Sequence, residues 1–172
     1  KLPEGLNLIV GALAIAPLAR IIAIAVDPVV NSTLLNIGRM ISAAAEQSPL
    51  IMGFLLGGIM KMICTSPLSS MALTAMLGLD GLAMGIAAIA CVGGSFTNGI
   101  IFDRLKLGER SNVMAVMLEP LTQADIITQI PIPIYGSNFF GGGLAGLAAA
   151  MLGIINNAPG TASPIPGLLA PF

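Results

Sequence analysis

The fold is predicted first from "PLIMGFLLGGIMKMICTSP", residues 49–67. Residues 49–64 form an apolar run, but a bilayer core needs about 20 apolar residues per helix, so the run is short. It ends at Thr65-Ser66-Pro67, where proline removes a backbone donor and disfavours helical geometry in the residue before it. A second short apolar piece, residues 67–79, follows until Asp80-Gly81 turns the chain. Two half-length helices in succession indicate a re-entrant or discontinuous membrane element.

The composition places this element in a membrane protein. Hydrophobic residues make up 56% of the chain and charged residues only 9%, whereas soluble domains carry roughly 25% charged residues. The net charge of −1 does not indicate the basic surface that binds nucleic acid. The chain opens at Lys1 and closes on "PIPGLLAPF", so we expect residues 1–172 to be a single membrane domain from a longer polypeptide.

Other apolar runs flank this element. Residues 6–26 are long enough to span a bilayer, although Pro17 and Arg20 interrupt them, and Asp27-Pro28 is expected to end that helix. Residues 28–46 place apolar side chains at helical spacing and predict an amphipathic helix in the membrane interface. Residues 81–102 form a further span. The pattern predicts an all-α integral membrane protein with several transmembrane helices and broken or re-entrant helical hairpins.

The second half of the chain has more interruptions. The apolar pattern is broken at Glu119-Pro120, is expected to dissolve in "PIPIYGSNFFGGG", and resumes over residues 142–155 before "NNAPGTASPIPG". Ser163-Pro164 repeats the Ser66-Pro67 break after a glycine-rich apolar run. Paired interruptions of this kind point to the binding site of a transporter with repeated halves. The similarity of the two breaks is explained equally well by a structural repeat and by chance, because glycine and proline are common in membrane helices.

The densest cluster of charge lies in residues 103–112, which contain "DRLKLGER". Short loops rich in Lys and Arg stay on the cytoplasmic side of a membrane. The sequence therefore predicts that this loop is cytoplasmic.

Glu119 is the main candidate for a binding residue. A carboxylate near the middle of a membrane is costly, so an acidic residue there is a functional hypothesis by default. The alternative is a solvated helix end at the interface. The backbone freed at Pro120, and the other irregular stretches, must be buried in protein or line a wet cavity, since unpaired peptide groups cannot face lipid.

Further polar residues fall at the predicted breaks or beside glycine. Thr65, Ser66 and Ser163 would supply hydroxyls at helix N-termini beginning at Pro67 and Pro164, or would only cap those helices. Asp125 is either a site residue or the cap of another short helix. The remaining polar candidates for substrate binding are Gln123, Asn98, Asn138 and Asn157, although amides beside glycine are also what turns use.

Lys61 is expected to extend to an interface or to pair with a carboxylate rather than to contact a ligand. Cys64 and Cys91 lie in apolar runs without CxxC spacing, so they are expected to be buried packing residues rather than a disulfide or metal pair. The chain has no histidine, and no nucleotide loop, zinc spacing or catalytic triad can be built from it. We therefore assign no catalytic residue, metal or cofactor.

Several of these stretches together resemble the enzyme IIC membrane component of the bacterial phosphotransferase system. They are "MLEPLTQAD", "TSPLSSMAL", "GGSFTNG", "IPIYGSNFFGGGLAG" and "NNAPGTASPIPGLLAPF". The most similar branch is the one called perfringolysin regulator-like. The resemblance runs from about Gly5 to the end of the chain and is densest after Gly93.

The resemblance implies sugar uptake coupled to phosphorylation at a bacterial cytoplasmic membrane. An enzyme IIC holds its sugar in a midmembrane cavity, a cytosolic IIB partner supplied by IIA phosphorylates it, and the IIC proteins form homodimers. In glucose-type relatives the glutamate of the Glu-Pro motif binds sugar hydroxyls, and Glu119 is the matching position. Those relatives commonly add a histidine, which this chain lacks. Neither cysteine fits the phosphocysteine, so phosphoryl transfer would need the separate IIB protein.

Two alternatives remain open at this level. One is a membrane-embedded regulator or sensor that binds a small polar ligand without transporting it. The other is a proton-coupled secondary transporter in which Glu119 or Asp125 carries the proton.

Overall fold

A computed structural model describes residues 4–170, and within them every regular element is helical. In chain order the elements are α1 (Glu4–Gln47), α2 (Pro49–Thr65), α3 (Ser70–Met76), α4 (Gly81–Arg104), α5 (Arg110–Leu118), the 3₁₀ helix η1 (Pro120–Gln123), α6 (Ala124–Ile127), α7 (Pro131–Met151) and α8 (Pro164–Leu169). The expected all-α class is confirmed.

Two of these helices have the length and composition to cross a membrane. They are the Gly11–Gln47 part of α1 and the whole of α4, Gly81–Arg104, while α2 is apolar but shorter. At about 1.5 Å per residue, α4 is roughly 36 Å long, enough for the roughly 30 Å of a bilayer core. The two helices fit an integral membrane protein.

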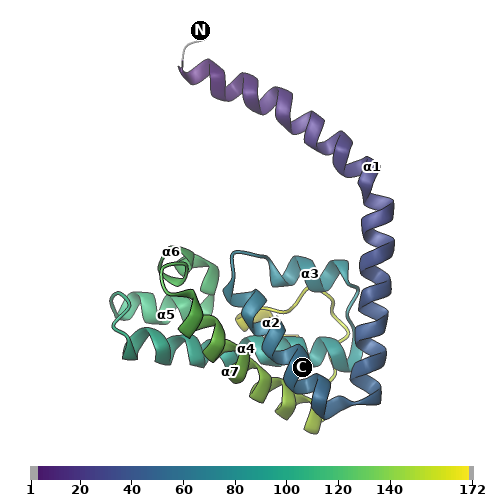
Figure 1. Cartoon of the computed structure of the whole chain (residues 1–172), viewed down its shortest axis with the longest axis vertical. Helices are drawn as coiled ribbons and strands as arrows, with labels where there is room; N and C mark the ends of the chain where they lie inside the picture. The colour runs from purple at the N-terminus through teal and green to yellow at the C-terminus, as the bar shows by residue number, and fades with distance from the viewer. Residues whose placement is uncertain (1–3, 171–172) are drawn as a thin grey trace.

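Helix α1 continues through Asp27-Pro28, so the helix end expected there is wrong. Pro17 and Pro28 both lie inside the helix, and Figure 1 shows the rod bending rather than ending. A proline removes one hydrogen bond and clashes with the carbonyl four residues earlier, which kinks a helix if the flanking turns stay helical. Only the second half of α1 packs on the body, where Gly38 meets the backbone of Leu77. An interfacial position for residues 28–46 stays a prediction.

The break between α2 and α3 lies where the sequence places it. Helix α2 ends at Thr65, and Ser66 has extended backbone angles. The Ser66 hydroxyl donates to the carbonyl of Ile63 at 2.7 Å and accepts from the N–H of Leu68 at 3.2 Å. The next helix does not begin at Pro67 as expected, because Ser69 is its cap and accepts from the N–H of Ala72 at 3.1 Å.

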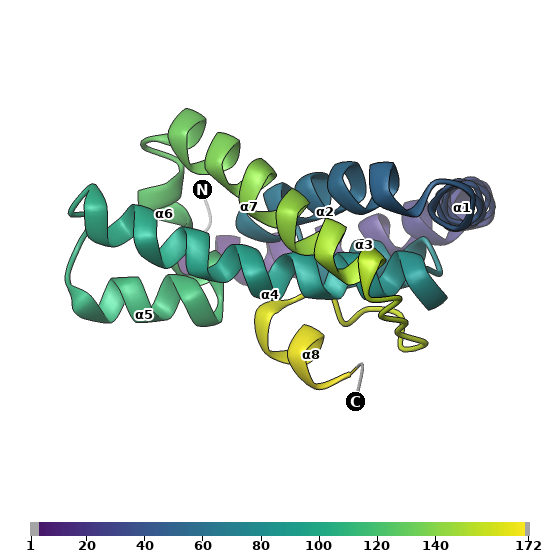
Figure 2. The same ribbon diagram turned by 90° about the horizontal axis from the view of Figure 1, so that it is seen from below.

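Helix α4 is the central element of the body. Most of its length is buried, and it contacts α2, α7, α5 and α8. Figure 2 shows α2 and α7 on one side of it and α5 and α8 on the other. Beyond the main core, a smaller apolar cluster lies at the α5 end of α4 and is formed by Phe102, Val116, Ile127 and Ile134.

The stretch 131–143 was expected to be irregular, and this is wrong, because it belongs to α7. Gly142 and Gly143 of this stretch, and Gly146 after it, face α2. A Cβ added at Gly57 would lie 2.6 Å from the carbonyl oxygen of Gly142 and 2.9 Å from the Cα of Gly146. Small residues allow membrane helices to approach closely, and this packing compensates for the low helix propensity of glycine. After α7, the chain is irregular up to Ser163, as expected.

Candidate functional site

The site begins at the end of α5, where Glu119 breaks the helix. Its backbone is extended, with φ −149° and ψ 98°, and Pro120 directly after it starts η1. The N–H of Glu119 still closes the last turn of α5 on Ala115 at 2.9 Å. The Glu-Pro pair therefore ends one helix and starts another without leaving this donor unpaired, and Glu119 is exposed at this corner.

The Ser-Pro break before α8 contacts this carboxylate. The hydroxyl of Ser163 donates to Oε2 of Glu119 at 3.2 Å, across 44 residues of sequence. Ser163 is buried, and its side chain does not cap α8. Ser163 and Glu119, both predicted from the sequence to bind the ligand, are therefore hydrogen-bonded to each other. Hydrogen bonds to an ionised acceptor are about twice as strong as neutral ones.

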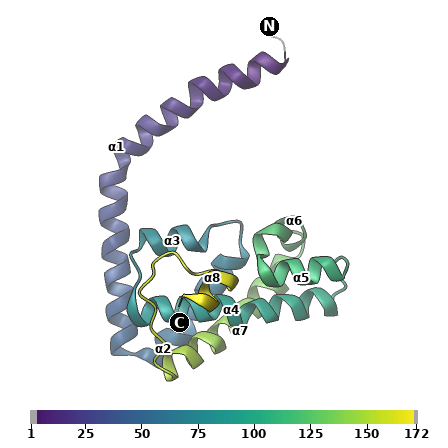
Figure 3. The same cartoon turned by 180° about the vertical axis from the view of Figure 1, so that it is seen from behind.

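The Ser-Pro break after α2 is the third helix break at the site. Ser70 at the start of α3 donates to the carbonyl of Ala162 at 2.6 Å, which ties α3 to the segment before α8. In Figure 3 this segment runs alongside α3. Between the three breaks lies a cavity of about 190 Å³ lined by Cys64, Leu68, Ser69, Ser70, Met71, Glu119, Leu121 and Ser163.

This cavity has the size and the mixed polar and apolar lining of a small-molecule site. At roughly 30 Å³ per water, its volume corresponds to about six waters. One carboxylate and three serines offer acceptors and donors, and the leucine and methionine side chains offer an apolar wall. A few placed polar groups on an apolar surface are what small-molecule sites generally have.

A second polar cluster joins three of the expected site residues next to this cavity. Nδ2 of Asn98 on α4 donates to the hydroxyl of Thr65 on α2 at 3.2 Å, and Asn138 on α7 donates to Oδ1 of Asn98. Asn138 also donates to the carbonyl of Ile134 at 2.8 Å, which leaves its Oδ1 buried without a partner. Thr65 directly follows Cys64, which lines the cavity.

The other expected site residues lie apart from the cavity lining. Gln123 is buried, accepts from Asn112 at 2.7 Å and so braces η1 against α5. Asp125 is exposed in the first turn of α6, whose N-cap is Gln123, so the expectation that Asp125 caps a helix is wrong. Asn157 is exposed, whereas its neighbour Asn156 orders the loop by bonding Thr161 and the N–H of Ala158. Ser66 only caps α2.

Lys61 does not extend to an interface, and that expectation is wrong. Its side chain is 0% exposed, and its ammonium donates to the carbonyl of Cys91 at 3.5 Å. In the part of the chain that the structure describes, the ion pair present joins Lys106 to Asp103 instead. Cys64 and Cys91 are both buried, as expected.

The cavity also contains residues that the sequence did not single out. Ser69 and Ser70 lie in "TSPLSS", three and four residues after Ser66, where the start of a helix after a Ser-Pro break would have indicated them. Across the described residues, no group of three or more histidine, cysteine or acidic side chains is placed to hold a metal ion.

Comparison with known proteins gives one match. No curated protein and no solved structure matches the chain. The family model described as "Phosphotransferase system, EIIC" matches residues 1–172, the whole chain. The chain belongs to the EIIC family of the phosphotransferase system, and it is therefore a membrane subunit of a sugar transporter that works with IIA and IIB proteins.

Proposed function

We propose that the cavity at Glu119 is the sugar-binding site of this EIIC subunit, at mid-membrane depth. The observation that carries the proposal is the convergence of three helix breaks on one cavity. The breaks at Glu119-Pro120 and Ser163-Pro164 are joined by a direct hydrogen bond, and Ser70 ties in the break after α2.

In this proposal, Glu119 accepts hydrogen atoms from sugar hydroxyls. Its Oε2 already accepts from the Ser163 hydroxyl, so a sugar hydroxyl can replace or join that donor without a change in the charge of the site. Ser69 and Ser70 add two further hydroxyls to the lining. Thr65, Asn98 and Asn138 form the polar cluster beside Cys64, and the Oδ1 of Asn138 is a buried acceptor there that has no donor.

The breaks also supply a mechanism for changing access. We propose that α2–α3 and α7–α8 are repeated, broken hairpins, each with a helix, a Ser-Pro break and a short helix. Both contribute to the cavity lining. Rigid-body movement of such halves would open the cavity to one side of the membrane and then to the other. The phosphoryl group comes from the cytosolic IIB partner.

The remaining features of the proposal concern the setting of the subunit. Residues 1–172 form a single membrane domain of an enzyme IIC in the perfringolysin regulator-like branch. The subunit is a homodimer that crosses a bacterial cytoplasmic membrane several times. Residues 103–112 lie on the cytoplasmic side, and residues 28–46 lie along the interface.

Uptake by reconstituted protein tests the role of Glu119. Vesicles containing the full-length protein receive candidate IIB and IIA partners, a phosphoryl donor and a panel of labelled sugars. Glu119→Gln should lower uptake by roughly 10- to 100-fold, because a hydrogen bond to a charged group contributes about 1.5–3 kcal/mol. Glu46→Gln is the matched control, because this substitution removes the same charge from an exposed residue of α1.

Other results would replace the proposal. Equal uptake by wild type and Glu119→Gln would remove Glu119 from the site. Binding of a sugar without phosphate-dependent uptake would favour a regulator or sensor. Uptake that needs a proton gradient but no IIB protein would favour a secondary transporter.

A further inference from the structure

One face of α4 lines a groove that the proposed sugar site does not use. Two adjoining hollows, of about 430 Å³ and about 310 Å³, lie along this face and share Phe96 and Met117. Residues three and four apart lie on one face of a helix, and the lining on α4 recurs at this spacing over about three turns. It includes Val92, Ser95, Phe96, Gly99, Ile100 and Arg104. The two hollows therefore form one groove, which we call the α4 groove.

The rest of the α4 groove comes from α5 and α8, which lie on the same side of α4 (Figure 2). A Cβ added at Gly99 would lie 2.5 Å from the sulfur of Met117, so α4 and α5 are in direct contact beside the groove. Leu118 extends the lining from α5, and α8 contributes Pro164, Ile165, Leu168 and Leu169. Three helices thus border the groove.

The end of the groove at α8 is apolar and open. Phe96, Leu168 and Leu169 are each more than half exposed. The polar side chain in this part of the lining is Ser95, and its hydroxyl donates to the carbonyl of Val92 at 2.6 Å, within α4. The other side chains of this part are apolar, so it suits hydrocarbon rather than a sugar.

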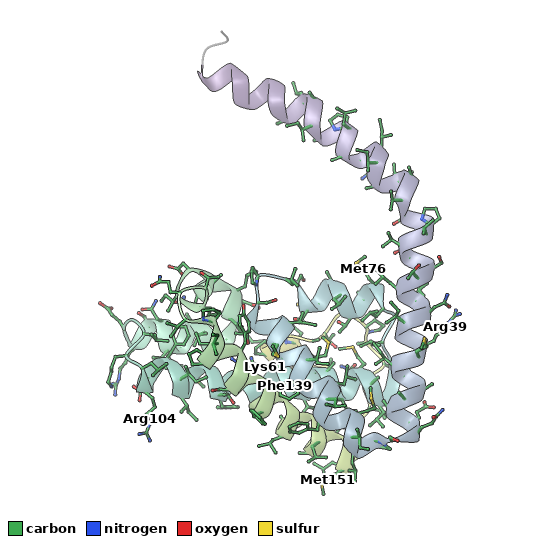
Figure 4. All side chains as sticks on the ribbon, viewed as in Figure 1. Arg39, Lys61, Met76, Arg104, Phe139 and Met151 are labelled. Atoms are coloured by element: carbon green, nitrogen blue, oxygen red, sulfur yellow. The ribbon has the colours of Figure 1, made fainter. Side chains whose placement is uncertain are left out.

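The opposite end of the groove is charged. Arg104 is the last residue of α4, is exposed and projects from the body (Figure 4). Asp103 also lines the groove, but its carboxylate pairs with Lys106 at 3.9 Å, and within residues 4–170 Arg104 forms no ion pair. The turn 103–110 carries three basic and two acidic residues, so its net charge is positive. A guanidinium in such a place can bind a phosphate through two parallel hydrogen bonds.

The length of the groove is close to the depth of one leaflet of a bilayer. From Val92 to Arg104, α4 rises about 18 Å at 1.5 Å per residue, and half of a hydrocarbon core is about 15 Å. A helix that crosses a membrane places its charged end near the lipid headgroups and the apolar residues before it among the lipid tails. The groove therefore presents a cation and then an apolar face in the order in which a phospholipid presents a phosphate and then a hydrocarbon chain.

We propose that the α4 groove binds one anionic glycerophospholipid. Arg104 holds its phosphate, and one acyl chain lies along Gly99, Phe96 and Leu168, between α4 and α8. Basic pockets between membrane helices are typical sites for anionic lipid headgroups. This site is separate from the Glu119 cavity, and the inference does not depend on the proposed sugar binding.

A tryptophan placed in the groove measures lipid binding, because residues 1–172 contain none. The full-length protein with Phe96→Trp is reconstituted in vesicles of phosphatidylcholine and phosphatidylglycerol, in which one of the two lipids carries brominated chains that quench a tryptophan in contact with them. After subtraction of the signal of the protein without the substitution, quenching gives the relative binding constant of the two lipids. Phe140→Trp is the matched control, because Phe140 is 62% exposed on α7, which lies on the other side of α4 (Figure 2).

Phosphatidylglycerol should bind about fivefold more tightly than phosphatidylcholine at Phe96→Trp, since one basic residue near an anionic lipid gives about this factor. At Phe140→Trp the ratio should be near one. Adding Arg104→Gln to Phe96→Trp should lower the ratio to within about twofold of one. Lys106→Gln is the matched control, because it removes the same charge from an exposed residue outside the groove lining and should keep the preference. If Phe96→Trp does not fold, Leu168→Trp reports from the same groove.

Three results would overturn the proposal. Equal ratios at the two reporter positions would mean ordinary contact with lipid and no site. A preference that survives Arg104→Gln would show that Arg104 does not hold the headgroup. Absence of quenching at Phe96→Trp by either lipid would mean that protein, from a second copy or another segment, covers the groove. None of these results alters the uptake expected for Glu119→Gln, so the two proposals fail separately.

Discussion

At the residue scale, Asn98 carries more of the interior hydrogen bonding than any local feature of its sequence indicates. Its amide donates to Thr65 on α2 and accepts from Asn138 on α7, so one side chain joins three helices. In hydrocarbon the alternative to such bonds is an unpaired polar group. Asn98 therefore fixes the relative rotation of helices whose other contacts are mostly apolar and non-directional.

Asn98→Ala should lower the free energy of unfolding by about 1–2 kcal/mol, since interhelical hydrogen bonds in membranes contribute roughly 0.6–2 kcal/mol and two partners lose theirs. Thermal unfolding of the purified protein in detergent measures this. Asn157→Ala is the control, because Asn157 is exposed, and its change should stay within about 0.5 kcal/mol. Similar effects of the two substitutions would contradict a structural role for the cluster.

At the element scale, the close approach of α2 and α7 explains why both helices are rich in glycine. Gly53 and Gly57 on α2 face Gly142 and Gly146 on α7, with four-residue spacing on each helix. This spacing puts the glycines on one face, where main chains can touch. Phe54 and Phe139 pack edge to face at 5.6 Å beside the contact.

Gly57→Ala should destabilise the protein by about 1–3 kcal/mol, because the added methyl group meets backbone that cannot rotate away. Gly136→Ala in α7 is the control. A Cβ at Gly136 has no neighbour within 4 Å, so this change should be neutral or stabilise the helix by up to about 1 kcal/mol. Thermal unfolding of both variants checks the comparison, and a neutral Gly57→Ala would mean that the helices are packed less closely.

At the scale of the whole molecule, the long exposed part of α1 and the basic turn after α4 lie far apart. Residues 12–30 of α1 are exposed and extend away from the body (Figure 1), while Arg104 lies at the opposite end of the body (Figure 4). The turn after α4 carries Lys106, whose side chain is 83% exposed. Apolar surface of this extent requires lipid or protein cover, whereas the basic turn requires water.

Lys106→Cys should therefore react with a membrane-impermeant maleimide in inside-out vesicles but not in intact cells, as the positive-inside rule predicts. The two native thiols are buried and give a low background. Labelling in intact cells would place residues 103–112 outside and invert the proposed topology.

The sequence by itself determined the features that depend on a few neighbouring residues. The composition specified a membrane protein, and prolines at Pro49, Pro67, Pro120 and Pro164 located helix ends, because a proline acts on the backbone within about one turn. The same rule failed at Pro28 and over residues 131–143, where the chain stays helical. In those places packing or the flanking turns outweigh local propensity.

Only the tertiary structure decided which polar side chains meet. Ser163 bonds Glu119 across 44 residues, and Ser70 bonds Ala162 across 92. Among the residues chosen from sequence, it brought Thr65, Asn98 and Asn138 into one cluster and left Asp125 and Asn157 exposed. It also buried Lys61 between two glycines of other helices. The physical reason is that burial and long-range hydrogen bonds depend on how helices are arranged, and local sequence patterns do not specify that arrangement.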